Sequence, residues 1–269
     1  MNRIPFKIRK EFERTEQQWD FLGIPRSTHA GYKTMKWRGG DSLENFEKNK
    51  PAGWTKDSIS YDHNSHGYRS IDFVADDNFS VASFGCSFTY GTGVPIEYTW
   101  PEIFCKSLQD QLCSPVNNFN FGWPATSADR ICRMVVKSIP ILKPNLVLIL
   151  LPDRNRCEKY GDDGYTRRLV PSNELWADYY AAWANDYDSK NNFLKNFVFI
   201  KTILELHDIP WLFATWDQYM TPLMLKKTKF VDGHRFFPDD FARDGSHPSV
   251  KAYTHLAKSF LEKYNQLYT

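Results

Sequence analysis

Short apolar runs alternate with amphipathic stretches over the C-terminal two thirds of the chain. Runs typical of buried strands occur at residues 80–85, 116–122, 145–151 and 209–215. Apolar residues at helical spacing predict helices at residues 100–113, 127–139, 191–208 and 248–267. Strands that alternate with helices are typical of parallel βαβ units. The pattern therefore predicts an α/β fold, a three-layer α/β/α sandwich.

Two parts of the chain lack this alternation. Residues 1–78 are polar, contain the turn signals RGGD and KPAGW, and have no long periodic segment. We expect them to form an N-terminal extension packed on a main domain of residues 79–269. Residues 153–190 interrupt the pattern after the third predicted strand. Ligands of open parallel sheets bind at the carboxyl ends of strands, so this insertion is placed where a substrate lid would lie.

Composition excludes several classes of protein. Of 269 residues, 42% are hydrophobic and 25% charged, which is ordinary for a globular chain. The formal charge is +2 and the basic residues are scattered, so we expect no nucleic-acid partner. Aromatic residues reach 16%. Core packing is the favoured explanation, and a flat ligand-binding wall is the alternative.

Cysteine spacing and hydropathy indicate the cellular compartment in which the protein is expected. Five cysteines without CxxC spacing fit neither a disulfide framework nor a zinc site, so a reducing environment is expected. The first 20 residues lack an apolar stretch typical of a signal peptide, and the aliphatic run at 146–151 is too short to span a bilayer. We expect a soluble, cytoplasmic protein, with a phage virion or unconventional export left open.

The first candidate for chemistry is Ser87, in the stretch SVASFGCSFTYGTGV. It follows the first predicted strand at a helix entrance, where free N–H groups and the helix dipole favour negative charge. Gly85 and Gly91 relieve crowding, so that a substrate carbonyl can approach the backbone. The alternative is that Ser87 is a helix N-cap, which is a common role of serine.

A serine nucleophile needs a base that is held by an acid. The stretch DGSHP supplies Asp244 and His247 just before the last predicted helix. The carboxylate could orient one ring nitrogen while the other faces Ser87, because loops after parallel strands emerge at one edge of the sheet. The alternative is a turn and helix cap. The combination of both stretches favours catalysis.

These stretches resemble the SGNH/GDSL hydrolase superfamily over residues 80–262. FGCSFTYGTGV resembles its first block and DGSHP its final block, and HGYRSIDF at 66–73 is similar to a segment that precedes the serine block in some bacterial and phage members. The resemblance implies a flavodoxin-like parallel sheet of about five strands. It also implies ester hydrolysis without metal or cofactor, with Ser87 as nucleophile, His247 as base and Asp244 as the orienting acid.

The second block of the family is altered in this chain. The family has an oxyanion-hole glycine five residues after an asparagine, whereas this chain has Ala125 there and Gly122 earlier. A backbone N–H serves whichever side chain it carries, so the donor can survive. The resemblance therefore implies the N–H groups of Ser87 and Ala125 as donors, with Gly122 as an alternative.

The third block is altered too. In PDRN, Arg154 stands where the family has its oxyanion asparagine, and Asn155 lies one residue later. Two interpretations stay open: a cation stabilises the oxyanion, or Arg154 or Arg156 pairs with Glu158 and has no catalytic role.

Other candidates are weaker. Residues that could bind substrate, or equally pack in the core, are Trp123, Arg156, Tyr165 and Trp176. His63 and His66 with Asp62 could begin a metal site, but surface positions are more usual, and no metal is expected. Cys86 is interpreted as a small buried side chain.

Together these features predict a serine esterase that removes a small acyl group, with acetyl on a carbohydrate as the substrate guess. The alternatives are a binding or structural module that keeps the fold without turnover, and an O-acyltransferase that uses the same triad but excludes water. The expected partner is a small-molecule or carbohydrate ester. The sequence does not indicate the oligomeric state.

Overall fold

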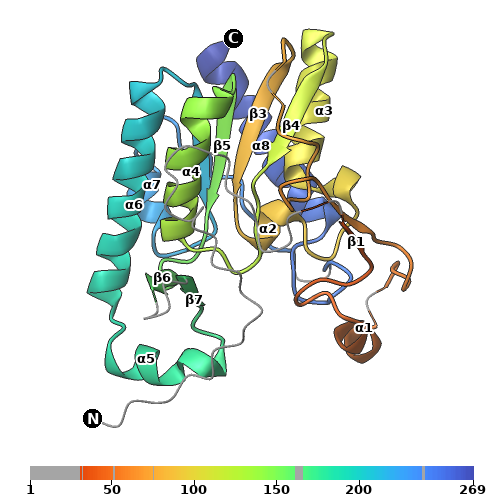
Figure 1. Cartoon of the computed structure of the whole chain (residues 1–269), viewed down its shortest axis with the longest axis vertical. Coiled ribbons are helices and arrows are strands. Elements are labelled where there is room, and N and C mark those ends of the chain that lie inside the picture. The colour runs from red at the N-terminus through yellow and green to blue at the C-terminus, as the bar shows by residue number, and fades with distance from the viewer. Residues whose placement is uncertain (1–30, 32, 51, 75, 161–165, 238–239) are drawn as a thin grey trace.

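The centre of the molecule is a four-stranded parallel sheet (Figure 1). The computed structural model describes residues 31–269 except 32, 51, 75, 161–165 and 238–239. The strands of this sheet, in spatial order, are β4 (Val116–Asn120), β3 (Phe79–Gly85), β5 (Leu146–Leu151) and β8 (Trp211–Thr215). Each falls in a run predicted to be a strand, and the predicted α/β class is confirmed.

The fifth strand of the expected sheet is reduced to one bridge in the described part of the chain. Phe213 of β8 pairs in parallel with Phe230. The N–H of Phe213 donates to the Lys229 carbonyl at 3.1 Å, and the N–H of Val231 donates to the Phe213 carbonyl at 2.8 Å. The sheet therefore ends in a single pair of hydrogen bonds beside β8.

Helices cover both faces of the sheet, which gives three layers (Figure 1). All six residues of β5 are buried, and successive side chains of a strand point to opposite faces. One core contains the side chains of Val147, Ile149 and Leu151 and lies under α4 (Ala128–Leu142) and α6 (Asp186–Leu206). The other contains Leu146, Leu148 and Leu150 and lies under α3 (Trp100–Leu112) and α8 (Val250–Tyr268).

Capping residues determine where the helices begin. Ser127 caps α4 as predicted, its hydroxyl accepting the N–H of Arg130 at 3.4 Å. Helix α6 begins five residues before its predicted start, because Asn185 caps it by accepting the N–H of Asp188 at 2.9 Å. Helix α8 begins at Val250, after Pro248 has formed a bridge with Phe241.

Several short elements gather at the carboxyl end of the sheet (Figure 1). Helix α2 (Ser87–Tyr90) follows β3 directly, and the 3-10 helix η2 (Ile96–Tyr98) precedes α3. The insertion after β5 forms elements that lie at the same end, as predicted: β6 (Cys157–Tyr160), β7 (Thr166–Leu169), η3 (Glu174–Trp176) and α5 (Ala177–Ala182). Helix α7 (Thr221–Met224) follows β8.

The described part of the N-terminal extension packs beside α2. It contains β1 (Lys33–Met35), α1 (Leu43–Asn49) and β2 (Tyr61–His63), and β1 pairs antiparallel with β2. The buried Arg69 guanidinium donates to the carbonyls of Gly91 at 2.7 Å and Val94 at 3.0 Å. These bonds tie the extension to the loop that follows α2.

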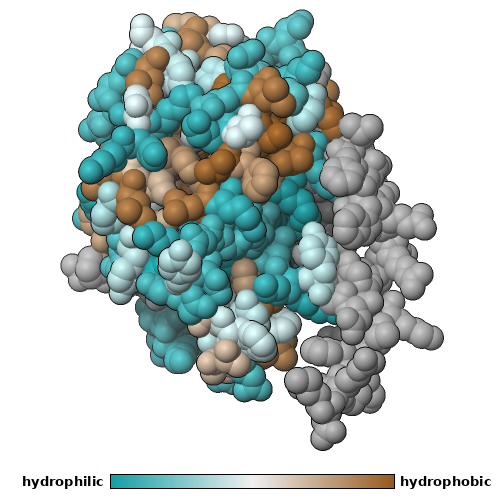
Figure 2. All heavy atoms as spheres, turned by 90° about the vertical axis from the view of Figure 1, so that its left-hand side faces the viewer, coloured by the Kyte–Doolittle hydropathy of each residue, from teal (hydrophilic) through white to brown (hydrophobic). Residues whose placement is uncertain are grey.

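The outer face of α6 is partly apolar. Figure 2 shows hydrophobic residues gathered on the side of the molecule that this helix covers. Val198, Phe199 and Leu206 are each more than half exposed. Within the described residues, no helix is both long and apolar enough to cross a membrane.

Candidate active site

Ser87 is the first residue of α2 and lies at the carboxyl end of β3. Cys86, not Ser87, occupies the N-cap position, and no side chain caps this helix. Among the described residues, the Ser87 hydroxyl has no hydrogen-bond partner, and the N–H groups of Ser87 and Phe88 have no acceptor. The capping role is therefore not filled by Ser87, and the helix start presents a hydroxyl together with unpaired N–H groups.

Glycine is required just before this helix. A Cβ on Gly85 would overlap the Thr89 hydroxyl and lie 3.0 Å from the Leu150 carbonyl oxygen. Only glycine lets the first turn of α2 fold this closely against the ends of β3 and β5. The expected relief of crowding at Gly85 is confirmed.

Asp244 and His247 form a hydrogen-bonded pair. Asp244 Oδ2 contacts His247 Nδ1, and Oδ1 accepts the N–H groups of His247 at 2.9 Å and Ser246 at 3.0 Å. Burial raises the pKa of the Asp244 carboxyl, but the hydrogen bonds and charge of His247 and the N–H of Ser246 outweigh it and lower the pKa to about 2. The carboxylate thus stays ionised at neutral pH and fixes Nδ1, which leaves Nε2 for other chemistry.

The loop that carries this pair lies against α2 and the loop after it. The rings of Phe88 and His247 meet edge to face, with centroids 5.6 Å apart. The N–H of Arg243 donates to the Gly93 carbonyl at 2.8 Å. The structure therefore brings the serine block and the Asp244–His247 block together, although Ser87 Oγ forms no hydrogen bond with His247 among the described contacts.

The loop after β4 lies against the same helix. Asn120 donates from Nδ2 to the Thr89 carbonyl at 2.9 Å, and its Oδ1 accepts the N–H of Gly122 at 2.8 Å. That N–H is therefore engaged, and we leave Gly122 out of the oxyanion hole. Ala125 adopts a φ of 60°, in the left-handed region that favours glycine. Such strained residues persist where the surroundings impose them, often at functional sites.

Arg154 is held by carboxylates. Its N–H donates to Asp217 Oδ2 at 2.8 Å, and its guanidinium contacts Asp217 at 3.2 Å and Asp186 at 2.5 Å. The side chains of Arg154 and Asp217 are buried. Glu158, the partner in one of the two interpretations that the sequence left open, pairs with Arg133 at 2.9 Å instead. The pairing of Arg154 with Glu158 was wrong, and because Asp217 and Asp186 already balance the charge of Arg154, we leave Arg154 out of the oxyanion hole.

Asn155 keeps a side chain without a hydrogen bond among the described residues. Its carbonyl accepts the hydroxyl of Tyr180 at 2.7 Å, and its N–H donates to Asp153 at 2.7 Å. The backbone here is fixed while the side-chain amide stays available.

An aromatic cluster that the sequence did not predict surrounds Phe88. The ring centroids of Trp216, His234 and Phe236 lie 5.1, 5.6 and 5.5 Å from that of Phe88. Arg156 lies over the Trp216 ring at 4.9 Å. Burial and the charge of Arg235 lower the pKa of His234 to about 4, so its ring is neutral at pH 7. The residue after Ser87 therefore sits in an aromatic wall, with the Arg156 cation against the Trp216 ring.

The remaining candidates have other surroundings. Trp123 is 3% exposed, so its ring is core rather than an open stacking surface. Trp176 ends η3 and is half-buried, and Tyr165 lies outside the described residues. Cys86 is fully buried, and all five cysteines are free.

The histidines of the HNSH stretch do not converge on a shared ligand. His63 Nδ1 contacts the Lys33 carbonyl at 3.1 Å, and Nε2 contacts the Tyr90 hydroxyl at 2.9 Å. Asp62 is exposed on the opposite side of β2 and accepts the Thr34 hydroxyl at 2.6 Å. His66 Nδ1 contacts the Ser65 hydroxyl at 3.1 Å.

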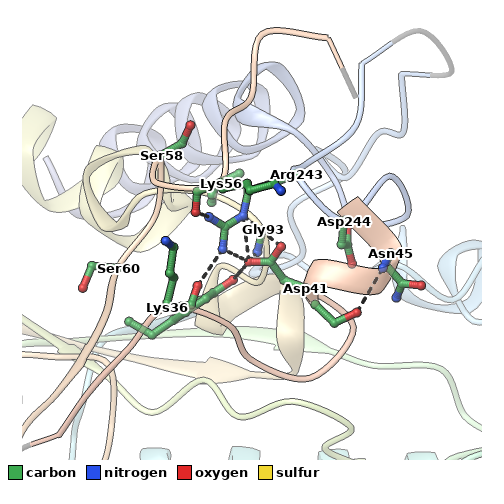
Figure 3. A network of polar contacts seen from close by, with 12 residues as sticks. Lys36, Asp41, Asn45, Lys56, Ser58, Ser60, Gly93, Arg243 and Asp244 are labelled. Carbon is green, nitrogen blue, oxygen red and sulfur yellow. Dashed lines mark hydrogen bonds and ion pairs between the residues drawn. The ribbon is translucent and has the colours of Figure 1, made fainter. Parts of the chain in front are cut away.

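A buried ion pair supports the Asp244 loop from the N-terminal extension (Figure 3). Arg243 contacts Asp41 at 2.6 Å through Nη2 and at 3.0 Å through Nε, and both side chains are 0% exposed. Tyr61 donates its hydroxyl to Asp41 at 2.5 Å and accepts the N–H of Gly93 at 2.9 Å. Asp41 thus holds Arg243, the residue before Asp244, and through Tyr61 it is connected to the loop after α2.

Asp41 ends a turn that lies across this region. A Cβ on Gly40 would lie 3.2 Å from Asp244 Oδ2 and 3.6 Å from His247 Cε1, so the exposed Gly40 faces the pair. Arg38 of the same turn lies 5.0 Å above the Trp123 ring, in the loop after β4. The turn at residues 38–41 therefore lies against both the Asp244–His247 pair and the loop that contains Trp123 and Ala125. Sequence reasoning missed it, although the RGGD turn and the Arg243–Asp244 neighbours were visible signals.

Comparison with known proteins finds solved structures that are similar at low sequence identity. No protein-family model and no curated sequence matches the chain. Solved structures similar to it include a lipase from a goat rumen metagenome, at 13% identity and a TM-score of 0.49, covering 69% of this chain and 97% of the other. A G-D-S-L family protein from Desulfitobacterium hafniense has 14% identity and a TM-score of 0.45, with 69% and 99% covered. A family 3 carbohydrate esterase from Clostridium thermocellum has 13% identity and a TM-score of 0.46, with 70% and 96% covered.

Proposed function

We propose that the protein is a serine ester hydrolase, with Ser87 as nucleophile, His247 as general base and Asp244 as the acid that orients the histidine. The observation that carries the proposal is the hydrogen-bonded pair of buried, ionised Asp244 and half-buried His247, packed on an uncapped helix whose first residue is Ser87. Asp244 holds Nδ1, so Nε2 is the nitrogen that accepts the Ser87 proton. Hydrogen bonds between a nucleophile and its base are often looser before substrate binds.

The reaction proceeds through an acyl-enzyme. Ser87 Oγ attacks the ester carbonyl while its proton passes to His247, and the carbonyl oxygen becomes an oxyanion. The free N–H of Ser87 and the N–H of Ala125 stabilise that charge, with the Asn155 amide as third donor. His247 then protonates the leaving alcohol. Water attacks the acyl carbon and gives a proton to His247; the bond to Ser87 Oγ then breaks, His247 returns the proton to Oγ, and the acid leaves.

The aromatic cluster around Phe88 favours a small apolar acyl group. Rings of Phe88, Trp216 and Phe236 provide apolar surface next to the nucleophile, and an acetyl group is the simplest occupant. A carbohydrate as the alcohol part is the expectation carried from the sequence.

A second candidate is a binding module without turnover. It is favoured by two observations: Ser87 Oγ forms no hydrogen bond with His247, and the residue at the family's asparagine position is an arginine neutralised by Asp217. Such a module would bind an ester without cleaving it.

Hydrolysis of 4-nitrophenyl acetate separates the two candidates. Ser87→Ala should lower kcat/KM by about 10³-fold or more and should abolish covalent labelling by a fluorophosphonate. Ser107→Ala is the matched control, because that serine lies on α3 and bonds only its own helix at Ile103. A folded wild type with neither turnover nor labelling would make the binding module the better explanation.

A further inference from the structure

Three arginines from separate parts of the chain meet at the loop after β4. Arg38 of the N-terminal extension lies 5.0 Å from the centre of the Trp123 ring, and Arg130 from the first turn of α4 lies 5.5 Å from it. Arg168, from β7 of the insertion, donates from Nη1 to the Pro124 carbonyl at 2.8 Å. We call these three residues the arginine cluster.

Within the described residues, no carboxylate forms an ion pair with Arg130 or Arg168. The nearby acids are engaged elsewhere. Glu158 pairs with Arg133, and Asp129 accepts the side-chain amide of Asn196 at 2.8 Å. Desolvation and the charges of Arg130 and Arg38 lower the pKa of Arg168, while the charge of Glu158, across from it on β6, opposes this. Arginine nevertheless stays protonated, so Arg130 and Arg168 carry positive charge that forms no ion pair with a carboxylate of the described residues.

The cluster lies beside the reaction centre. The N–H of Trp123 donates to the Gly85 carbonyl at 3.0 Å, two residues before Ser87. Pro124, which Arg168 contacts, is followed by Ala125, the proposed oxyanion donor. A charge bound by the cluster would therefore lie next to the scissile ester rather than on a remote surface.

We propose that the substrate is an anionic ester, whose alcohol part carries a carboxylate or phosphate group that the arginine cluster binds. The proposal rests on the proposed esterase function. Guanidinium groups suit this task because their planar N–H donors match carboxylate and phosphate oxygens, often in pairs. The Trp123 ring keeps two of the cations in place by cation–π contact.

The test compares esters that differ in charge. The probes are 4-nitrophenyl acetate, which is neutral, 4-nitrophenyl hemisuccinate, with a carboxylate on the acyl part, and 4-acetoxybenzoate and 4-acetoxyphenyl phosphate, which carry the charge on the alcohol part. We expect wild type to prefer at least one of the last two esters over the neutral one by about tenfold or more in kcat/KM, and this preference should fall as ionic strength rises. A preference for the hemisuccinate alone would place the charge on the acyl part and contradict the proposal. The better of the last two esters reports which group is bound.

Variants assign the preference to the cluster. Arg130→Gln and Arg168→Gln should each lower kcat/KM for the preferred anionic ester about tenfold more than they lower that for 4-nitrophenyl acetate. Lys258→Gln removes the same charge from an exposed position on α8 and should change neither. Equal rates for neutral and anionic esters in wild type, unaffected by either arginine substitution, would overturn the anionic substrate while leaving the esterase intact.

A binding measurement keeps this test separate from catalysis. Titration calorimetry of Ser87→Ala with 4-acetoxybenzoate and with 4-acetoxyphenyl phosphate should show binding that Arg168→Gln weakens about tenfold. If no ester is hydrolysed but this arginine-dependent binding remains, the esterase function fails and the anion site stands. If neither anion binds, the anion site fails whatever the rates are.

Discussion

Replacing Asp41 by asparagine tests the buried link between the N-terminal extension and the loop that carries Asp244. The substitution keeps the size of the side chain and removes its charge. Arg243 would then be a fully buried cation without a counter-charge, since its other acceptors are the carbonyls of Lys36 at 2.8 Å and Lys56 at 3.0 Å.

The expected loss is large. Removing one partner of a buried ion pair costs about 3–5 kcal/mol, and the two carbonyl contacts place Asp41→Asn near the lower value, at about 3 kcal/mol in the free energy of unfolding. Because Arg243 directly precedes Asp244, the substitution should also shift the acid. A misplacement of this kind is expected to lower kcat about tenfold or more.

Urea unfolding followed by tryptophan fluorescence measures the first effect, and 4-nitrophenyl acetate hydrolysis the second. Asp57→Asn is the matched control, because it removes the same charge from an exposed ion pair with Lys36 and should leave both measurements unchanged. Asp41→Asn combined with Arg243→Met should recover stability if the unpaired charge is the cause. An Asp41→Asn protein as stable and active as wild type would refute the reasoning.

Three further predictions concern the same region. Ala125→Gly should raise the free energy of unfolding by about 1 kcal/mol, because glycine accepts the positive φ without strain; an unchanged urea midpoint would contradict this. Asp244→Asn should lower the free energy of unfolding by about 2–3 kcal/mol at neutral pH, because the pKa of the folded carboxyl, about 2, is below that of the unfolded chain. This difference from wild type should be present above about pH 4 and disappear as pH falls toward 2. A difference that stays constant across that range would contradict the prediction. Gly40→Val should lower kcat without changing the urea midpoint, because a Cβ there already lies 3.2 Å from Asp244 Oδ2, and equal kcat would exclude a role for this turn.

The sheet and its helices were predictable because local pattern determines them. A run such as that of β5 is apolar at every position, which is what burial on both faces requires. The reduction of the fifth strand to one bridge could not be predicted from local pattern. It depends on how closely the segment around Phe230 approaches the edge of β8, which is a long-range contact.

The site was predictable only where neighbours in sequence are neighbours in space. Asp244 and His247 lie three residues apart, so their pairing follows from a short motif. Arg154 pairs across 63 residues with Asp217, and Arg243 across 202 residues with Asp41. Side-chain direction in a loop and long-range pairing of charges do not follow from spacing, so the partner of Arg154 was wrong and that of Arg243 was missed.

The Asp41–Arg243 pair also changes where this protein can be divided. A chain cut to begin at Phe79 would retain the four-stranded sheet, the serine block and the Asp244–His247 block, and by sequence motif it would look complete. It would nevertheless lack the counter-charge of Arg243 and the hydroxyl of Tyr61 that holds Gly93. The smallest unit that recombination or engineering could transplant with this loop held in place therefore includes the extension, which acts as part of the α/β domain rather than as a separable appendage.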